Sequence, residues 1–91
     1  MKSPVKDLLN NHQKLNHSEM MKVESHVQRK TDEWYINTLM IEGYDVPFKY
    51  KRKKLYKKLN GQRVNLTYYP AHEEIAGLII EVMNVVRIKV S

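Results

Sequence analysis

Two stretches in the second half of the chain, residues 44–51 and 63–69, alternate between apolar and polar residues, and this pattern constrains the fold most strongly. Their apolar members are Tyr44, Val46, Phe48 and Tyr50, followed by Val64, Leu66 and Tyr68. Because successive side chains of a β-strand point to opposite faces, each stretch predicts a strand with one buried face. We expect the intervening residues, among them Lys49, Lys51 and Tyr69, to point outward.

Two neighbouring segments favour further strands. Residues 34–41 are rich in β-branched and aromatic side chains, which is typical of strands. Pro70 is expected to end the strand before it, because proline cannot continue a hydrogen-bonded ladder. The last segment, residues 75–90, is too long for one flat strand, so we expect a bend, bulge or break at Asn84.

The N-terminal third carries a different spacing, which predicts helices. Ser3 and Pro4 are suited to begin a first short helix, although residues 1–16 are equally open to being flexible. Asn16 and Glu19 form a capping-box pattern, and apolar residues follow at three- to four-residue steps. We therefore predict a second helix over residues 17–32, with Arg29 on its solvated face.

Between the second and third strands, residues 54–61 resemble one or two helical turns. Leu55 and Leu59 are expected to face inward, and Gly61 to end the turn in a left-handed conformation. The predicted fold class is α+β: an N-terminal helix or helix pair, then about five antiparallel strands in a small curled sheet or an OB- or SH3-like barrel. An OB barrel usually places its helix after the third strand, so the expected order fits that pattern only in part.

The size of the chain indicates a single domain. Its 91 residues suffice for one modest core, and we assign residues 1–91 to one domain with a β-rich region over 34–90. There is no cysteine, which excludes disulfides and thiolate metal sites and fits a reducing compartment. No apolar run has the length of a signal peptide or a membrane span. We therefore expect a cytoplasmic protein.

Charge is distributed unevenly along the chain. Residues 1–45 hold six basic and seven acidic residues, whereas residues 46–91 hold ten basic and three acidic residues. Eight of the sixteen Lys and Arg residues fall between Lys49 and Arg63, a stretch without an acid. Such an asymmetry is typical of proteins with an anionic partner, most often nucleic acid.

The leading hypothesis is a non-enzymatic domain that binds RNA or single-stranded DNA weakly and with little sequence specificity. Exposed tyrosines beside cations hold single strands by stacking, so two tyrosines join the predicted site. The predicted site consists of Lys49, Lys51, Arg52, Lys53, Lys54, Lys57, Lys58, Arg63, Tyr56 and Tyr69. A solvated cationic surface that only maintains solubility explains the same residues, and an acidic protein or a membrane headgroup are further partners of this charge.

The alternative hypothesis is an interaction or homodimerisation module. Apolar residues such as Met20 and Val27, and the apolar end of the chain, exceed what a small core is expected to bury, and a second copy would cover the excess. The basic face is then merely solvated.

The sequence carries no motif for catalysis or for metal binding. His17, Glu19 and His26, or His72 with its neighbouring glutamates, lack the spacing of a metal site. No serine or threonine lies in a nucleophile elbow. We therefore expect no catalytic residue, no metal, no cofactor and no small-molecule substrate.

The segments Tyr44–Lys54 and Gly61–Pro70 resemble a group of short bacterial proteins with no assigned function. This resemblance covers residues 34–90 and implies a small bacterial β-rich domain without a catalytic motif. Gly61-Gln62-Arg63-Val64, together with Arg87 in a terminal strand, is also similar to ribosome-dependent messenger RNA interferases of toxin–antitoxin systems. Those enzymes begin with a strand, where this chain is expected to begin with helices.

Overall fold

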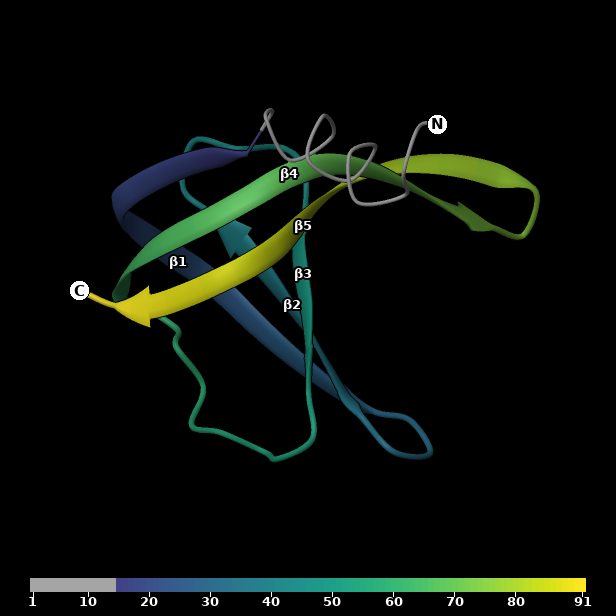
Figure 1. Ribbon diagram of the computed structural model, residues 1–91, viewed down its shortest axis with the longest axis horizontal. Helices are drawn as coiled ribbons and strands as arrows, with labels where there is room; N and C mark the ends of the chain where they lie inside the picture. Colours follow the sequence, from purple (N-terminus) through teal and green to yellow (C-terminus); the bar gives the residue numbers. More distant parts are fainter. Residues whose placement is uncertain (1–14) are drawn as a thin grey trace, which may run out of the picture.

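Five β-strands close into a barrel in the computed structural model, which describes residues 15–91. They are β1 (Asn16–Lys30), β2 (Tyr35–Ile41), β3 (Phe48–Arg52), β4 (Arg63–Ile75) and β5 (Leu78–Val90). Their order around the barrel is β1-β2-β3-β5-β4, and β1 pairs with β4 to close it (Figure 1). All neighbours are antiparallel except β3 and β5. This arrangement is compatible with an OB-like Greek-key barrel.

The predicted helix over residues 17–32 is wrong, because these residues form most of β1. The described residues contain no helix, so the α+β assignment is replaced by an all-β fold. Two register shifts in β1, between Ser18 and Met21 and between Val23 and Ser25, explain the error. Each bulge turns a two-residue step between inward side chains into a three-residue step, which resembles helical spacing. The first predicted helix lies almost entirely outside the described residues.

The predicted helical turns over residues 54–61 are also wrong, because this segment is a loop across one end of the barrel. Leu55 is exposed, whereas Leu59 packs against the core as expected. Gly61 has a φ of 78°, so its left-handed conformation is confirmed, but in a turn before β4. Side chains of β1 hydrogen-bond to the backbone of Tyr56 and Leu59, and these contacts replace the internal hydrogen bonds of a helix.

The barrel interior confirms much of the predicted alternation. The buried core cluster consists of Met21, Val23, Leu39, Ile41, Phe48, Val64, Leu66 and Tyr68. Tyr50 packs partly against it. Tyr44, which was expected to face inward, is instead exposed in the loop before β3, where its ring forms a T-shaped pair with Phe48 at a centroid distance of 5.3 Å. The second predicted strand therefore begins only at Phe48.

Strands β4 and β5 extend beyond the barrel as a hairpin arm, residues 70–83, which projects to the right in Figure 1. The arm shows that the expected strand end at Pro70 is wrong. Since β1 pairs with β4 only as far as Tyr68, Pro70 occupies an edge where it breaks no ladder to β1. An irregularity in β5 is confirmed, but it lies two residues after the expected position: a register shift leaves Val86 as the extra residue, whereas Asn84 pairs regularly with Tyr69.

No helix among residues 15–91 is long and apolar enough to cross a membrane.

Candidate functional site

The outer surface of β1, β2 and β3 carries two rows of side chains, which we call the strand face. The strand register aligns Arg29, Ile36 and Lys51 in one row and Val27, Thr38 and Lys49 in the other. These residues point outward because their neighbours along the same strands, such as Asn37 and Phe48, are buried. The rows therefore combine cations with apolar side chains on one surface.

Two hollows lie on the strand face. The first has a volume of about 300 Å³ and is lined by Val27, Arg29, Ile36, Thr38, Pro47 and Lys49. The second, of about 80 Å³, shares Ile36 and Lys49 with the first and reaches Glu73 of the arm; its other lining residues are Tyr50, Lys51 and Asn84. The surface is thus grooved, with the arm as one wall.

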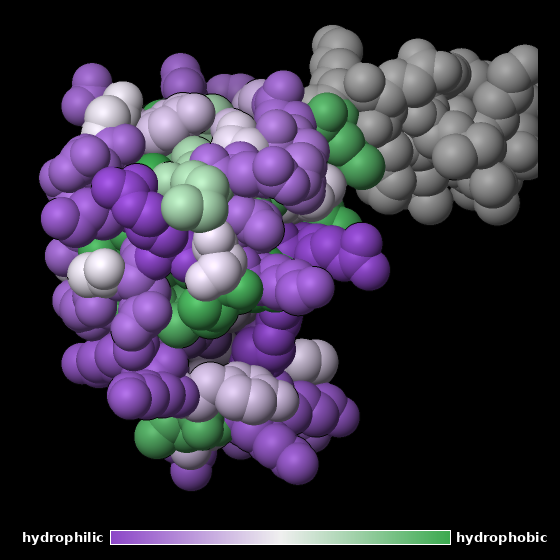
Figure 2. Space-filling model, turned by 90° about the vertical axis from the view of Figure 1, so that its left-hand side faces the viewer, coloured by the Kyte–Doolittle hydropathy of each residue, from purple (hydrophilic) through white to green (hydrophobic). Residues whose placement is uncertain are grey.

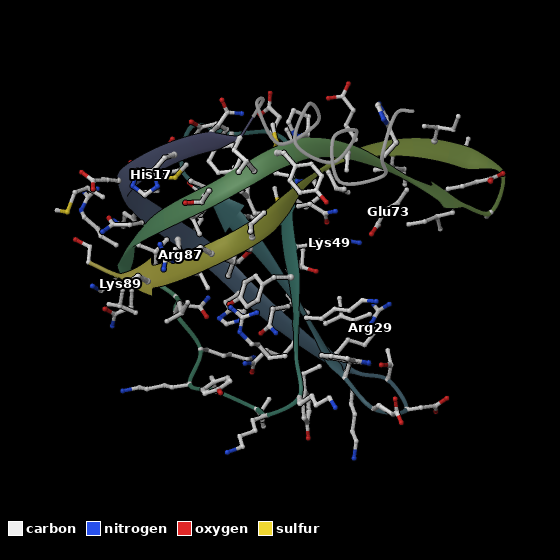
Figure 3. The ribbon with its side chains drawn as sticks, in the orientation of Figure 1. His17, Arg29, Lys49, Glu73, Arg87 and Lys89 are labelled. Atoms are coloured by element: carbon white, nitrogen blue, oxygen red, sulfur yellow. The ribbon has the colours of Figure 1, made fainter. Side chains whose placement is uncertain are left out.

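An ion pair joins the arm to the strand face. Lys49 Nζ donates to Glu73 Oε1 at 2.7 Å, and both side chains are part-buried. Figure 3 shows the two side chains pointing toward one another from β3 and β4. Because a carboxylate already neutralises Lys49, this lysine contributes less to anion binding than the sequence suggests.

Tyr69 lies at the base of the arm, in the row of Lys49. Lys49 pairs with Asn84 of β5, and Asn84 pairs with Tyr69 of β4. The Asn84 amide donates to the Tyr69 hydroxyl at 3.0 Å. This hydrogen bond holds a half-exposed aromatic ring beside the cations.

A second aromatic ring extends the strand face at the turn between β1 and β2. The Lys53 ammonium lies 5.3 Å from the ring centroid of Trp34, within the range of a cation–π contact. The turn is held by Thr31, whose amide donates to the Trp34 carbonyl at 2.7 Å. Trp34 is half-buried, so part of its ring faces solvent.

The ten residues predicted as a site do not form one patch. Lys49, Lys51, Lys53 and Tyr69 belong to the strand face. The loop and barrel end hold five others, Arg52, Lys54, Tyr56, Lys57 and Lys58. Arg63 lies apart at the start of β4, where its guanidinium donates to the Met20 carbonyl at 2.9 Å.

The predicted site did not include the outward residues of β1, of β2 and of the turn between them, among which are Arg29, Trp34 and Ile36. Arg29 was placed on the surface of a helix that does not form. The pattern of β-rich residues over 34–41 was recognised, but its outward side was not linked to β3. The pairing of β2 with β3 aligns Ile36 with Lys51, and no local pattern contains this long-range contact.

A separate cationic surface lies on the opposite side of the barrel. Its hollow of about 350 Å³ is lined by His17, Glu19, Asn65, Arg87 and Lys89. In Figure 3 the labelled residues of this group lie far from Arg29 and Lys49, and Figure 2 shows that this side is mainly hydrophilic. The cations of this second surface lie beside polar side chains, whereas the cations of the strand face lie beside apolar and aromatic side chains.

Two tyrosines of the barrel, Tyr50 and Tyr68, have raised pKa values. Burial raises the pKa of Tyr50, and the nearby Arg52 charge opposes this effect. Burial also raises the pKa of Tyr68, against its hydrogen bond to Ser18. In the part of the chain that the structure describes, no three His, Cys, Asp or Glu side chains gather closely enough to hold a metal ion.

No family model, curated protein or solved structure matches the chain. The two resemblances noted from the sequence therefore stay predictions.

Proposed function

We propose that the protein binds single-stranded nucleic acid, RNA or DNA, on the strand face, weakly and with little sequence specificity. The observation that carries this proposal is the pair of rows in which Arg29, Lys49 and Lys51 lie beside apolar side chains, between the rings of Trp34 and Tyr69. Single strands are bound by such combinations, because cations attract the backbone while flat rings and apolar surface accept the bases.

The spacing of the cations suits an extended anion. Arg29 and Lys51 flank Ile36 in one row, and neighbouring strands are about 4.8 Å apart, which places their backbones about 10 Å apart. Both are charged side chains without a carboxylate partner among residues 15–91, where the ion pairs are His17–Glu19 and Lys49–Glu73. Two phosphates of one strand, one on each side of a group that packs on Ile36, would then each meet one of the two cations.

The number of available cations limits the affinity. Arg29, Lys51 and Lys53 remain on the strand face once Lys49 is paired with Glu73. Three phosphate contacts to a single strand correspond to a slope of about −2 in a plot of log affinity against log salt concentration. Binding is therefore expected to be detectable at low salt and weak near physiological salt.

The test is a fluorescence-anisotropy titration with short single-stranded RNA and DNA at two salt concentrations. The double variant Arg29→Glu/Lys51→Glu is expected to lose binding. Arg87→Glu/Lys89→Glu makes the same charge change on the opposite side and is expected to retain most of it. No binding by the unmodified protein at low salt would overturn the proposal, and equal losses in both variants would assign binding to net charge instead of the strand face.

A second candidate function is self-association through the arm. Its end exposes Ile75, Leu78, Ile79 and Ile80, and Ile79 is 75% exposed. Within residues 15–91 the arm strands pair only with each other beyond Tyr68 and before Met83. No further strand of residues 15–91 therefore pairs with their outer edges, where a second copy could add one. Analytical ultracentrifugation tests this candidate: Ile79→Lys is expected to convert a dimer to a monomer, and a monomeric unmodified protein would contradict it.

A further inference from the structure

A cavity of about 230 Å³ opens at the end of the barrel under the loop of residues 53–62. Its walls come from β1, β2, β3, β5 and this loop, and the residues that line it are His26, Asn37, Tyr50, Arg52, Tyr56, Lys57, Leu59, Ile88 and Val90. The cavity opens on the inner side of β3, because side chains alternate along the strand: Tyr50 and Arg52 line the cavity, whereas Lys51 points outward to the strand face. Tyr50 is the one residue that lines both the cavity and the smaller hollow of the strand face.

The cavity exists because the loop covers this barrel end only partly. Only Leu59 from the middle of the loop packs against the core, while Leu55 and Tyr56 remain exposed. A helix at this position would fill the barrel end with a row of apolar side chains. The loop leaves apolar wall residues, Ile88 and Val90, facing open space.

The buried polar groups of the cavity are already paired with one another. The Leu59 amide donates to His26 Nδ1 at 2.9 Å, so Nδ1 is the acceptor and Nε2 carries the hydrogen of the neutral ring. Nε2 lies 2.7 Å from Asn37 Oδ1 and donates to it. Asn37 in turn donates to the Tyr35 carbonyl at 3.2 Å. These groups hold the wall in place and have little capacity left to read the polar edge of a nucleobase.

The cations at the cavity, by contrast, have no carboxylate partner among the described residues. The ion pairs of residues 15–91 involve neither Arg52 nor Lys57. The Arg52 guanidinium lies 4.9 Å from the ring centroid of Tyr50 and donates one hydrogen bond, to the Lys51 carbonyl. Arginine has five N–H donors, so most of them remain for a ligand.

We propose that this cavity binds a small apolar monoanion, of which an aromatic carboxylate is the simplest kind. Its apolar body would contact Leu59, Ile88 and Val90, and its carboxylate would bind Arg52 and Lys57 at the rim. The volume holds about eight water molecules at about 30 Å³ each and is below the usual range of drug-sized pockets. A ligand with a single aromatic ring, or with two fused rings, therefore matches the volume of the cavity. This site is independent of nucleic-acid binding by the strand face.

The experiment compares 2-naphthoate with the neutral 2-naphthylmethanol and with adenosine monophosphate, using calorimetry and amide NMR spectra of the intact chain. We expect naphthoate to bind about tenfold more tightly than the alcohol, as for a charge-assisted hydrogen bond worth about 1.4 kcal/mol. The Leu59 amide is expected to shift, because its partner His26 lines the cavity. Adenosine monophosphate is expected to bind more weakly than naphthoate.

Variants assign the binding to the cavity. Arg52→Gln/Lys57→Gln is expected to bring the affinity ratio of naphthoate to alcohol close to one, whereas the matched change Lys51→Gln/Lys53→Gln on the strand face is expected to leave it unaltered. Lys57→Gln alone alters an exposed side chain and lowers the ratio without risk to folding. Equal binding of acid and alcohol, no binding of either, or tighter binding of adenosine monophosphate would each overturn the proposal.

Discussion

The inner and outer sides of β1, β2 and β3 differ in the partners of their side chains. On the inner side, Phe48 is fully buried, and His26 and Asn37 complete each other's hydrogen bonds. On the outer side, Lys51 and Arg29 have no carboxylate partner within residues 15–91, and Lys49 has one in Glu73. In these three strands, therefore, the inward side chains form the core contacts that stabilise the barrel, whereas the outward side chains keep charges at the surface that are unpaired within the described residues.

The largest expected effect tests the inner side. Phe48 is fully buried and packs its ring against Tyr68 at a centroid distance of 4.9 Å. Phe48→Ala is expected to lower the free energy of unfolding by about 3–5 kcal/mol, because the loss of apolar contact adds to the cost of a cavity. Lys51→Ala, on the outer side of the same strand, should change it by less than about 0.5 kcal/mol. Urea denaturation of both variants measures the two free energies of unfolding. Similar decreases in both variants would contradict the difference between the inner and outer sides.

A second test compares two histidines of β1. His26 is 3% exposed and accepts from the Leu59 amide, whereas His17 is exposed. His26→Ala leaves that amide and Asn37 without their partner and is expected to cost about 1–3 kcal/mol of stability. His17→Ala is the matched control and should cost less than about 0.5 kcal/mol. Thermal unfolding followed by circular dichroism measures the stability of both variants. If His26→Ala left the stability unchanged, the loop would not depend on the hydrogen bond from the Leu59 amide to His26.

A third test uses pH. Burial raises the pKa of Tyr50 and Tyr68 above the ordinary value of 10.0. Below pH 10 both states of the protein keep these tyrosines neutral, but above it the unfolded chain loses its protons first, so stability is expected to fall as pH rises. Melting temperatures measured across this range should show the decline, and Tyr68→Phe should make it shallower. An unaltered slope in the variant would contradict the assignment to Tyr68.

The smallest expected effect sharpens the description of the outer side. Glu73→Gln releases Lys49 from its ion pair, which adds one available cation to the strand face. The slope of log affinity for single strands against log salt should steepen by about 0.7, with a stability loss below about 1 kcal/mol because the pair is partly exposed. Glu74→Gln makes the same change of net charge next to it on the exposed arm. Anisotropy titrations that gave both variants the same slope would show that Lys49 does not reach the ligand.

Sequence reasoning was accurate where strands are regular. Phe48, Val64, Leu66 and Tyr68 were correctly expected inside, because an uninterrupted alternation reports directly on the two faces of a strand. It failed over residues 17–32, where bulges change the step between inward residues. Bulges of this kind depend on register with the partner strands, which a local pattern does not contain.

The candidate site was recognised in part for the same reason. Lys51 was expected on an outward face from the alternation of β3 alone. Arg29 and Trp34 join it only because the pairing of β1 with β2 places Arg29 beside Ile36 and the pairing of β2 with β3 places Ile36 beside Lys51. Conversely, Arg63 is only five residues from Lys58 in sequence but lies apart on β4.

By itself, the sequence determined the composition and the faces of the regular strands: an excess of cations in the second half, and a set of apolar residues that must be buried together. These properties are local, since they depend on residue type and on the two-residue period of a strand. The tertiary structure alone decided which cations share a surface, which one is neutralised by Glu73, and where a cavity remains under the loop. Each of these depends on contacts between residues far apart in the chain, and such contacts arise only when the five strands close into a barrel.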